Sequence, residues 1–293
     1  MDDLRPGRLF VFGLGYSMTR LARRLRDLGW QIAGTTRDAD RLERLRDEGF
    51  EAHAFGPDQP LDPATLAGTT HLVQSISPEE SGDPTVPALA EALRALPQLG
   101  WAGYLSTPSV YGDRGGAWID ESADPTPGSP RGWKRLEAER AWFTAFQSTG
   151  VAVQVFRLAG IYGPGRSAFD QLRHGRARRI DKPGQVFNRI HVDDIGTVLM
   201  ASMRRPAPGA IYNVADGHPS SPNDPIEHAA RLLGIDPPPL IPFEQAGLSP
   251  LGREFYSECK RLKVDRIIDE LGAHLAYPSY REGLDAIWAE ERA

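Results

Sequence analysis

The residues best placed for chemistry begin at a glycine-rich turn near the start of the chain, Gly13-Leu14-Gly15-Tyr16-Ser17-Met18. A tight turn with little side-chain bulk lets the backbone approach a pyrophosphate, and the free N–H groups of a following helix attract its negative charge. We expect this anion site to include Gly13, Gly15, Tyr16, Ser17 and Met18. Met18 stands where a third glycine is usual, which predicts a helix slightly farther from its strand. The alternative is a simple glycine turn before a helix.

A second candidate site follows the next apolar run and reads Gly34-Thr35-Thr36-Arg37. A site for NAD usually has Asp or Glu here to bind the ribose 2′-hydroxyl. This stretch has no carboxylate, and the guanidinium of Arg37 can pair bidentately with a 2′-phosphate. The sequence therefore predicts NADP in preference to NAD; the alternative is that Arg37 is a solvated surface charge. Ser75, Ile76 and Ser77, after a later strand, complete the predicted cofactor site.

The elements that must position these residues alternate between strands and helices. Apolar runs predict strands at 8–12, 30–36, 71–76, 101–106 and 151–156, and helical spacing predicts helices over 18–28, 40–48, 86–96 and 135–147. This alternation is typical of an α/β fold with a doubly wound parallel sheet. We predict a Rossmann-type NAD(P)-binding core over residues 1–160, to which 188–214 return. Residues 161–187 and 215–293 are predicted to form a smaller, substrate-binding lobe.

The composition of the chain limits the classes of partner that we expect it to bind. The chain has 293 residues, a formal net charge of −5, 40% hydrophobic residues and one cysteine, Cys259, as in an ordinary globular protein without disulfides. No segment approaches 18 consecutive apolar residues, and the first residues lack the pattern of a secretory signal. We expect a cytoplasmic protein that acts on small molecules, with no nucleic-acid, membrane or metal partner. The oligomeric state stays open, a homodimer included.

Several motifs, in order along the chain, resemble the extended short-chain dehydrogenase/reductases, also called the NAD-dependent epimerase/dehydratase family. Beyond the glycine turn, the similar segments are 105–112, 157–165, 189–195, 212–216, 271–272 and 277–284. The resemblance covers most of the chain and implies a core that binds the cofactor and a C-terminal lobe that binds the substrate. It also places Thr107 at the position of a catalytic Ser or Thr.

The same resemblance implies a Tyr-x-x-x-Lys pair, which this chain does not match. The corresponding segment is Ser129-Pro130-Arg131-Gly132-Trp133-Lys134-Arg135, so Arg131 takes the Tyr position and Arg135 the Lys position. Arginine cannot act as a general acid near neutral pH because its pKa is above 12. We therefore predict that the usual proton relay is absent, as in the atypical YeeZ-like branch, while Arg135 still reaches the ribose or a phosphate of the cofactor.

Two classes of function follow. The first is an NADP-dependent oxidoreductase or epimerase-like enzyme, whose predicted catalytic residues are Thr107, Tyr111, Arg131 and Arg135, with Thr107, Tyr111 or water handling the proton. The second is a non-catalytic NADP-binding protein with a redox-sensing or regulatory role. The retained Thr107 favours the enzyme, and the lost pair favours the sensor. Arg166 and Arg189 join Tyr111 and Arg131 as polar candidates for binding an anionic substrate, or they are structural arginines.

Overall fold

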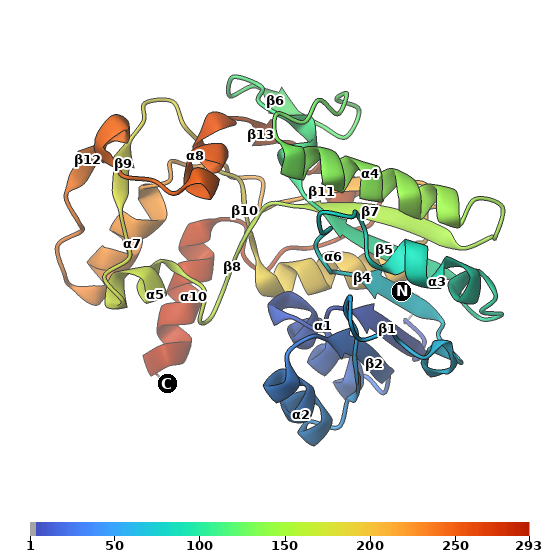
Figure 1. Cartoon of the computed structure of the whole chain (residues 1–293). Helices are drawn as coiled ribbons and strands as arrows, with labels where there is room; N and C mark the ends of the chain where they lie inside the picture. The colour runs from blue at the N-terminus through green and yellow to red at the C-terminus, as the bar shows by residue number, and fades with distance from the viewer. Residues whose placement is uncertain (1–3, 293) are drawn as a thin grey trace. The chain divides into compact units, whose positions relative to one another are not determined.

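Seven strands form one sheet in the computed structural model, which describes residues 4–292. In chain order they are β1 (Arg8–Phe12), β2 (Gln31–Thr36), β3 (Glu51–Ala54), β4 (His71–Gln74), β5 (Trp101–Ser106), β7 (Ala152–Leu158) and β11 (Ile211–Val214). Their order across the sheet is β11-β7-β5-β4-β1-β2-β3, and the pairings from β7 to β3 are parallel (Figure 1). The predicted doubly wound, Rossmann-type sheet is confirmed. The order reverses between β1 and β4, where open parallel sheets bind ligands.

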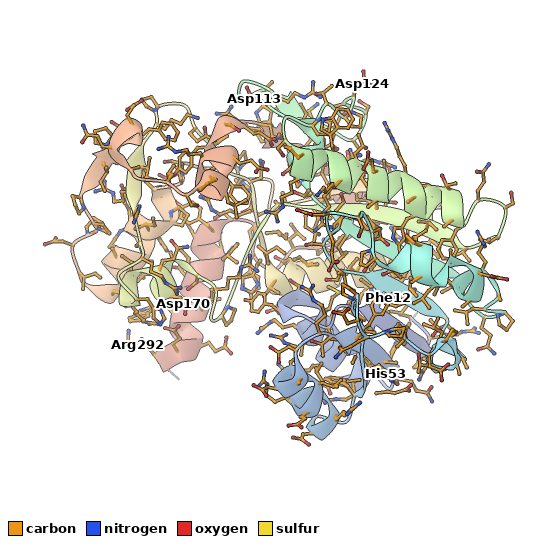
Figure 2. The ribbon with its side chains drawn as sticks, in the orientation of Figure 1. Phe12, His53, Asp113, Asp124, Asp170 and Arg292 are labelled. Atoms are coloured by element: carbon orange, nitrogen blue, oxygen red, sulfur yellow. The ribbon has the colours of Figure 1, made fainter. Side chains whose placement is uncertain are left out.

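Helices cover both faces of this sheet. The helices beside the sheet are α1 (Tyr16–Asp27), α2 (Ala39–Asp47), α3 (Thr85–Arg94), α4 (Pro130–Ala145) and α6 (Val192–Arg204). On one face α3 and α4 lie side by side (Figure 1). They contribute Leu89, Leu93 and Trp142 to an apolar cluster with Phe10 and Phe12 of β1; Figure 2 labels Phe12. Another contact joins α1 and α6, where the Arg24 guanidinium donates to the Thr197 hydroxyl at 3.0 Å.

Some elements differ from the sequence-based expectations, among them α4 and β3. Helix α4 begins at Pro130 instead of residue 135, so both Arg131 and Arg135 lie on it. Proline favours the first turn of a helix because its missing N–H needs no partner there. Strand β3 was not predicted from the sequence, because its Glu-Ala-His-Ala pattern has few of the β-branched residues that mark a strand. Pairing with β2 forms it at the edge of the sheet.

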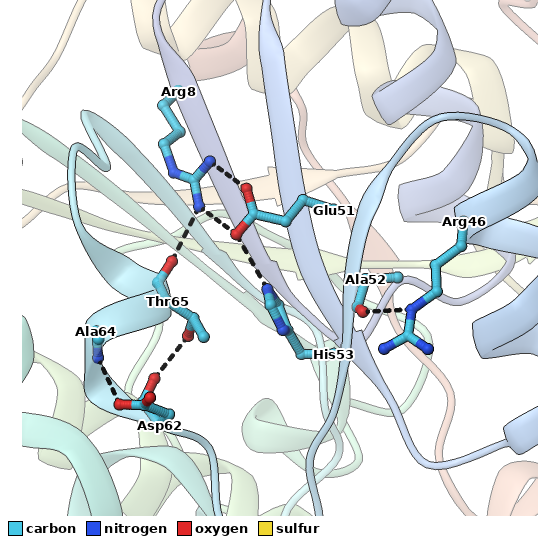
Figure 3. A network of polar contacts seen from close by, with 8 residues as sticks. All are labelled: Arg8, Arg46, Glu51, Ala52, His53, Asp62, Ala64 and Thr65. Carbon is cyan, nitrogen blue, oxygen red and sulfur yellow. Dashed lines mark hydrogen bonds and ion pairs between the residues drawn. The ribbon is translucent and has the colours of Figure 1, made fainter.

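A polar network ties this sheet edge together. The Arg8 guanidinium in β1 donates to both carboxylate oxygens of Glu51 in β3, at 2.6 and 2.9 Å, and to the carbonyl of Thr65 at 2.9 Å (Figure 3). His53 contacts the same carboxylate at 3.1 Å. The Arg8 guanidinium lowers the pKa of Glu51, and burial only partly opposes this effect. The Glu51 side chain remains 44% exposed, so solvent screens the pair.

The chain divides into two compact units. Unit 1 comprises residues 1–107, 130–157 and 196–212, and unit 2 comprises 108–129, 158–195 and 213–293. Unit 2 contains α5 (Ala168–Arg173), α7 (Asp224–Leu233), α8 (Pro250–Ser257), α9 (Asp265–Asp269) and α10 (Tyr280–Arg292). Three parallel strand pairs accompany them: β8 (Gly160–Tyr162) with β10 (Arg189–His191), β9 (Arg179–Asp181) with β12 (Leu240–Pro242), and β6 (Trp118–Ile119) with β13 (Arg261–Leu262). Between residues 4 and 292, no helix is long and apolar enough to cross a membrane.

A buried ion pair fastens α4 to the sheet in unit 1. The Arg157 guanidinium of β7 donates to both carboxylate oxygens of Glu139 at 3.1 and 2.7 Å, and the Ser106 hydroxyl of β5 donates to the same carboxylate at 2.5 Å. Each charged side chain of the pair is only 2% exposed. A buried ion pair is costly to break because the remaining charge loses its partner. The pair therefore sets how α4 lies against β5 and β7.

We predict that Glu139→Ala lowers the free energy of unfolding by about 3–5 kcal/mol, because it removes the carboxylate of a buried ion pair with Arg157. Urea unfolding followed by circular dichroism measures this loss. The matched control is Glu51→Ala, which removes the screened pair of Figure 3 and should cost about 1 kcal/mol or less. Equal losses in the two variants would contradict a special role for the buried pair.

Candidate functional site

A cleft opens in unit 1 where the strand order reverses. Its volume is about 400 Å³. The lining comes from the end of β2, from the segments that follow β1, β2, β3 and β4, and from one residue of α2. These residues are Gly13, Leu14, Gly15, Thr35, Thr36, Arg37, Arg41, Phe55, Ser75, Ile76, Ser77, Pro78 and Glu79. The cleft thus gathers six predicted cofactor residues, namely Gly13, Gly15, Arg37, Ser75, Ile76 and Ser77. It lies at the carboxyl edge of the sheet, as ligand sites in this architecture do.

The glycine turn is held by the neighbouring strand. The backbone N–H of Gly13 donates to the Thr35 hydroxyl at 3.1 Å, and that of Leu14 donates to the Thr35 carbonyl at 2.7 Å. Gly13 has φ +89°, and a Cβ there would lie 3.1 Å from the Ile76 side chain. Leu14 packs over Gly34, where a Cβ would meet its side chain at 2.8 Å. Both positions therefore require glycine to bring the turn close to its neighbours.

The start of α1 can receive an anion. Gly15 is its N-cap, and no side chain among the described residues caps it. A Cβ on Gly15 would have the Gly13 carbonyl, at 3.9 Å, as its nearest neighbour, so space lies beside this backbone. The first N–H groups of a helix attract negative charge. Tyr16 and Ser17 begin the helix, whereas Met18 is 1% exposed and packs in the core.

Charges of both signs line the far side of the cleft. The Arg37 guanidinium forms an ion pair with Glu79 at 2.9 Å, and the Arg41 guanidinium donates to the Leu14 carbonyl at 3.3 Å. The sequence analysis missed both Arg41 and Glu79. The signal for Arg41 was its position in the first turn of α2, four residues after Arg37. No local pattern predicts that Glu79 reaches the same place. A carboxylate therefore lies beside Arg37 although none ends the strand.

A buried side chain shapes the turn that follows β4. The Gln74 amide nitrogen donates to Asp83 and Thr85 at 2.9 and 2.7 Å, and its amide oxygen accepts from the backbone N–H of Ile76 at 3.0 Å. Asp83 in turn accepts from two N–H groups at the start of α3. These bonds orient Ser75, Ile76 and Ser77 along the cleft. Gln74 therefore acts as a positioning residue.

Arg135 links helix α4 to the cleft. Its guanidinium donates to the Ser77 hydroxyl at 2.7 Å and to the Leu105 carbonyl, at the end of β5, at 2.8 Å. It also lies 3.4 Å from the Tyr104 hydroxyl. Burial raises the pKa of Tyr104 well above its ordinary value, and Arg135 only partly opposes this shift. Since Tyr104 is also fully buried, it is unsuited to exchanging protons with a ligand.

The other predicted catalytic residues fall in both units. In unit 1, Thr107 directly follows β5, and Arg131 is exposed in the first turn of α4. In unit 2, Tyr111 is fully buried and its hydroxyl donates to Asn213 at 2.8 Å. Arg166 and Arg189, predicted as candidates for an anionic ligand, line one pocket of unit 2. No three His, Cys, Asp or Glu side chains in the described part of the chain gather as metal ligands.

The sequence is similar to those of two differently named proteins. No family model matches it. Protein YeeZ of Escherichia coli K12 is 28% identical over 283 residues, which cover 92% of this chain and 96% of that protein. A 3-diazoavenalumate denitrifying reductase from a Streptomyces species is 29% identical over 83% of this chain and 75% of its own length.

Comparison with solved structures supports the description of the fold. A functionally unknown conserved protein from Silicibacter pomeroyi is 48% identical, with a TM-score of 0.90, over 98% of this chain and all of that one. MoeE5, solved in complex with UDP-glucose and NAD, covers 98% of this chain and 99% of its own with a TM-score of 0.79. At 21% identity, MoeE5 shows a shared fold.

We predict that two glycines of the same turn differ in how much they contribute to stability. Gly13→Ala should lower the free energy of unfolding by about 1–3 kcal/mol, because alanine disfavours a positive φ. Gly15→Ala should change it by less than about 0.5 kcal/mol, since φ is −86° and the space is open. Chemical denaturation measures both. A large loss in Gly15→Ala, or none in Gly13→Ala, would show that the turn is built differently.

Proposed function

The chain belongs to the family of the conserved Silicibacter pomeroyi protein, and we propose that it is an NADP-binding oxidoreductase or epimerase-like enzyme of a small, anionic substrate. The observation that supports this proposal best is the cleft at the reversal point of the sheet. It combines the glycine turn, the uncapped start of α1 and the Arg37 guanidinium. MoeE5, which shares the fold, binds NAD in its solved complex, and the Streptomyces relative is by name a reductase.

The residues of the cleft fit a dinucleotide in three parts. The turn at Gly13 and Gly15 and the start of α1 would hold the pyrophosphate. Arg37 and Arg41 would hold a 2′-phosphate on the ribose at the end of β2. Ser77 and Arg135, which already contact each other, would flank the nicotinamide half. A bound nicotinamide supplies hydride exchange with a substrate carbon.

Arg131 and Arg135 occupy, in this proposal, the places of the family's Tyr and Lys. Arg135 keeps the positive charge but not the compact shape of lysine, and Arg131 cannot donate a proton at neutral pH. Thr107 after β5, or a water molecule, would then transfer the proton. The buried Tyr111 hydroxyl already donates to Asn213, which makes it the weaker candidate.

The alternative, a non-catalytic redox sensor that binds the same cofactor, is favoured by the exposed Arg131 in place of a proton donor. Turnover separates the two functions. A broad screen of alcohols and ketones with NADP and NADPH should reveal hydride transfer if the protein is an enzyme. Tight cofactor binding with no turnover of any substrate would favour the sensor. No binding of either nicotinamide cofactor would contradict both.

We predict that NADP binds more tightly than NAD, and that Arg37→Ala weakens NADP binding by about ten- to hundredfold, the loss expected for a charged hydrogen bond. Glu79→Gln should strengthen NADP binding, because it removes the carboxylate that competes for Arg37. Calorimetric titration with both cofactors measures these affinities. The control is Arg44→Ala, an exposed arginine on α2 outside the cleft. Equal affinities that Arg37→Ala leaves unchanged would refute the role of Arg37.

We predict that Arg135→Ala weakens cofactor binding by about ten- to hundredfold, through the loss of a charged hydrogen bond. Arg131→Tyr alone should not create alcohol dehydrogenase activity, because Arg135 differs from lysine in shape and hydration. Titrations and the turnover screen test both variants, with the exposed Arg140→Ala on the same helix as control. Turnover that is indifferent to Arg131→Ala and Arg135→Ala would place the chemistry elsewhere.

A further inference from the structure

Unit 2 contains a pocket of about 410 Å³, within the usual range for sites of small organic molecules. Strands β8 and β10 and helices α5, α7, α8 and α10 contribute to its wall, together with loop residues. Its charged lining consists of three arginines, Arg166, Arg178 and Arg189, with no Asp or Glu among the lining residues. The pocket therefore carries an excess of positive charge in a chain whose net charge is −5.

Aromatic rings form much of the remaining wall. Tyr162 and Tyr280 belong to one apolar cluster of unit 2, and Tyr256 and Phe187 to a second. All four line the pocket, so it lies where the two clusters meet. The rings of Phe187 and Tyr256 are edge-to-face, with centroids 5.1 Å apart. Flat apolar walls of this kind suit a planar ligand body.

The Arg189 guanidinium is held only by neutral acceptors. One terminal nitrogen, Nη1, donates to the Phe187 carbonyl at 3.1 Å and to the Ser220 hydroxyl at 2.7 Å. The other, Nη2, donates to the Ser221 carbonyl at 3.2 Å. Among residues 4–292, no carboxylate forms an ion pair with it, and its hydrogen bonds come from Nη1 and Nη2. The Nε and Nη2 edge thus keeps the two-pronged donor geometry that matches a carboxylate.

Asp216 does not supply the missing counter-charge. Its Oδ1 accepts from the backbone N–H of His218 at 2.9 Å, and its Oδ2 has no partner among the described residues. Burial raises the pKa of Asp216 to about 7, although Arg189 partly opposes this shift. Burial also lowers the pKa of Arg189 from its ordinary value, but a guanidinium remains charged. Asp216 and Asp224 act on the Arg189 charge through space, but neither forms a direct ion pair with its guanidinium among the described residues.

We propose that this pocket binds a planar, aromatic carboxylate, with the carboxylate on the Nε and Nη2 edge of Arg189 and the ring between the aromatic side chains. This ligand class deepens the proposed function, since the ligand would be the substrate of the oxidoreductase. Two other arginines of the lining, Arg166 and Arg178, are exposed and add attraction for an anion. Arg178 is held by the Ala246 carbonyl at 2.8 Å, another neutral acceptor.

Calorimetric titration of the full chain, without cofactor, tests the proposal with trans-cinnamate as probe. Cinnamamide has the same planar body without the charge and should bind at least about tenfold more weakly, and acetate, which lacks the ring, should bind more weakly still. Uridine 5′-diphosphate tests the alternative of a nucleotide. No binding of cinnamate, equal binding of cinnamamide, or tighter binding of the nucleotide would overturn the proposal.

Variants locate the binding. Arg189→Gln should weaken cinnamate binding by about tenfold or more, and Arg189→Lys, which keeps the charge but loses the two-pronged geometry, should weaken it by a smaller factor. If Arg189→Gln does not fold, Arg189→Lys and the exposed Arg178→Gln carry the test. Arg205→Gln, outside the pocket, is the control. NADP titration of the same preparations separates the two proposals, because it reports on unit 1 alone. Cinnamate binding that is indifferent to the Arg189 and Arg178 variants would refute the site.

Discussion

The buried ion pair between Arg157 and Glu139 fixes helix α4 against the sheet of unit 1, and the candidate site depends on this packing. It joins β7 to α4, and the Ser106 hydroxyl adds β5 to the same carboxylate. Because both charges are almost fully buried, α4 cannot slide along the sheet without leaving one of them uncompensated. One helical turn before Glu139, Arg135 is thereby held where it meets the Leu105 carbonyl and Ser77. A structural contact thus positions a side chain that contacts the lining of the cleft.

The cleft itself follows from the reversal of strand order between β1 and β4. The ends of three strands that are neighbours in the sheet, β1, β2 and β4, meet there. They are followed by a glycine turn, an arginine and a serine-containing turn, respectively. The bonds from Thr35 to the glycine turn and from Gln74 to Ile76 hold these segments in place within the protein. A ligand would therefore find the backbone already arranged, which lowers the entropy lost on binding.

The two pockets balance their charge in different ways. In unit 1, Arg37 has a carboxylate beside it, so an incoming phosphate must compete with Glu79. In unit 2, Arg189 is held by carbonyl and hydroxyl oxygens, and the lining contains no carboxylate. In unit 1, a ligand must replace the Arg37–Glu79 ion pair, which favours selectivity between ligands of different charge. The arrangement in unit 2 favours affinity for an anion, because no native pair is lost.

The sequence alone determined the alternating strands and helices, the glycine turn and its place after β1, because these depend on neighbouring residues and on apolar periodicity. It did not reveal β3, whose formation depends on pairing with β2, or the start of α4 at Pro130. It also missed Arg41, Glu79 and Gln74, and it could not show that Arg178 and Arg189 share a pocket. Only the tertiary structure decided these points, since they depend on contacts between segments far apart in the chain. The position of Glu79 beside Arg37, 42 residues away in sequence, is the clearest case.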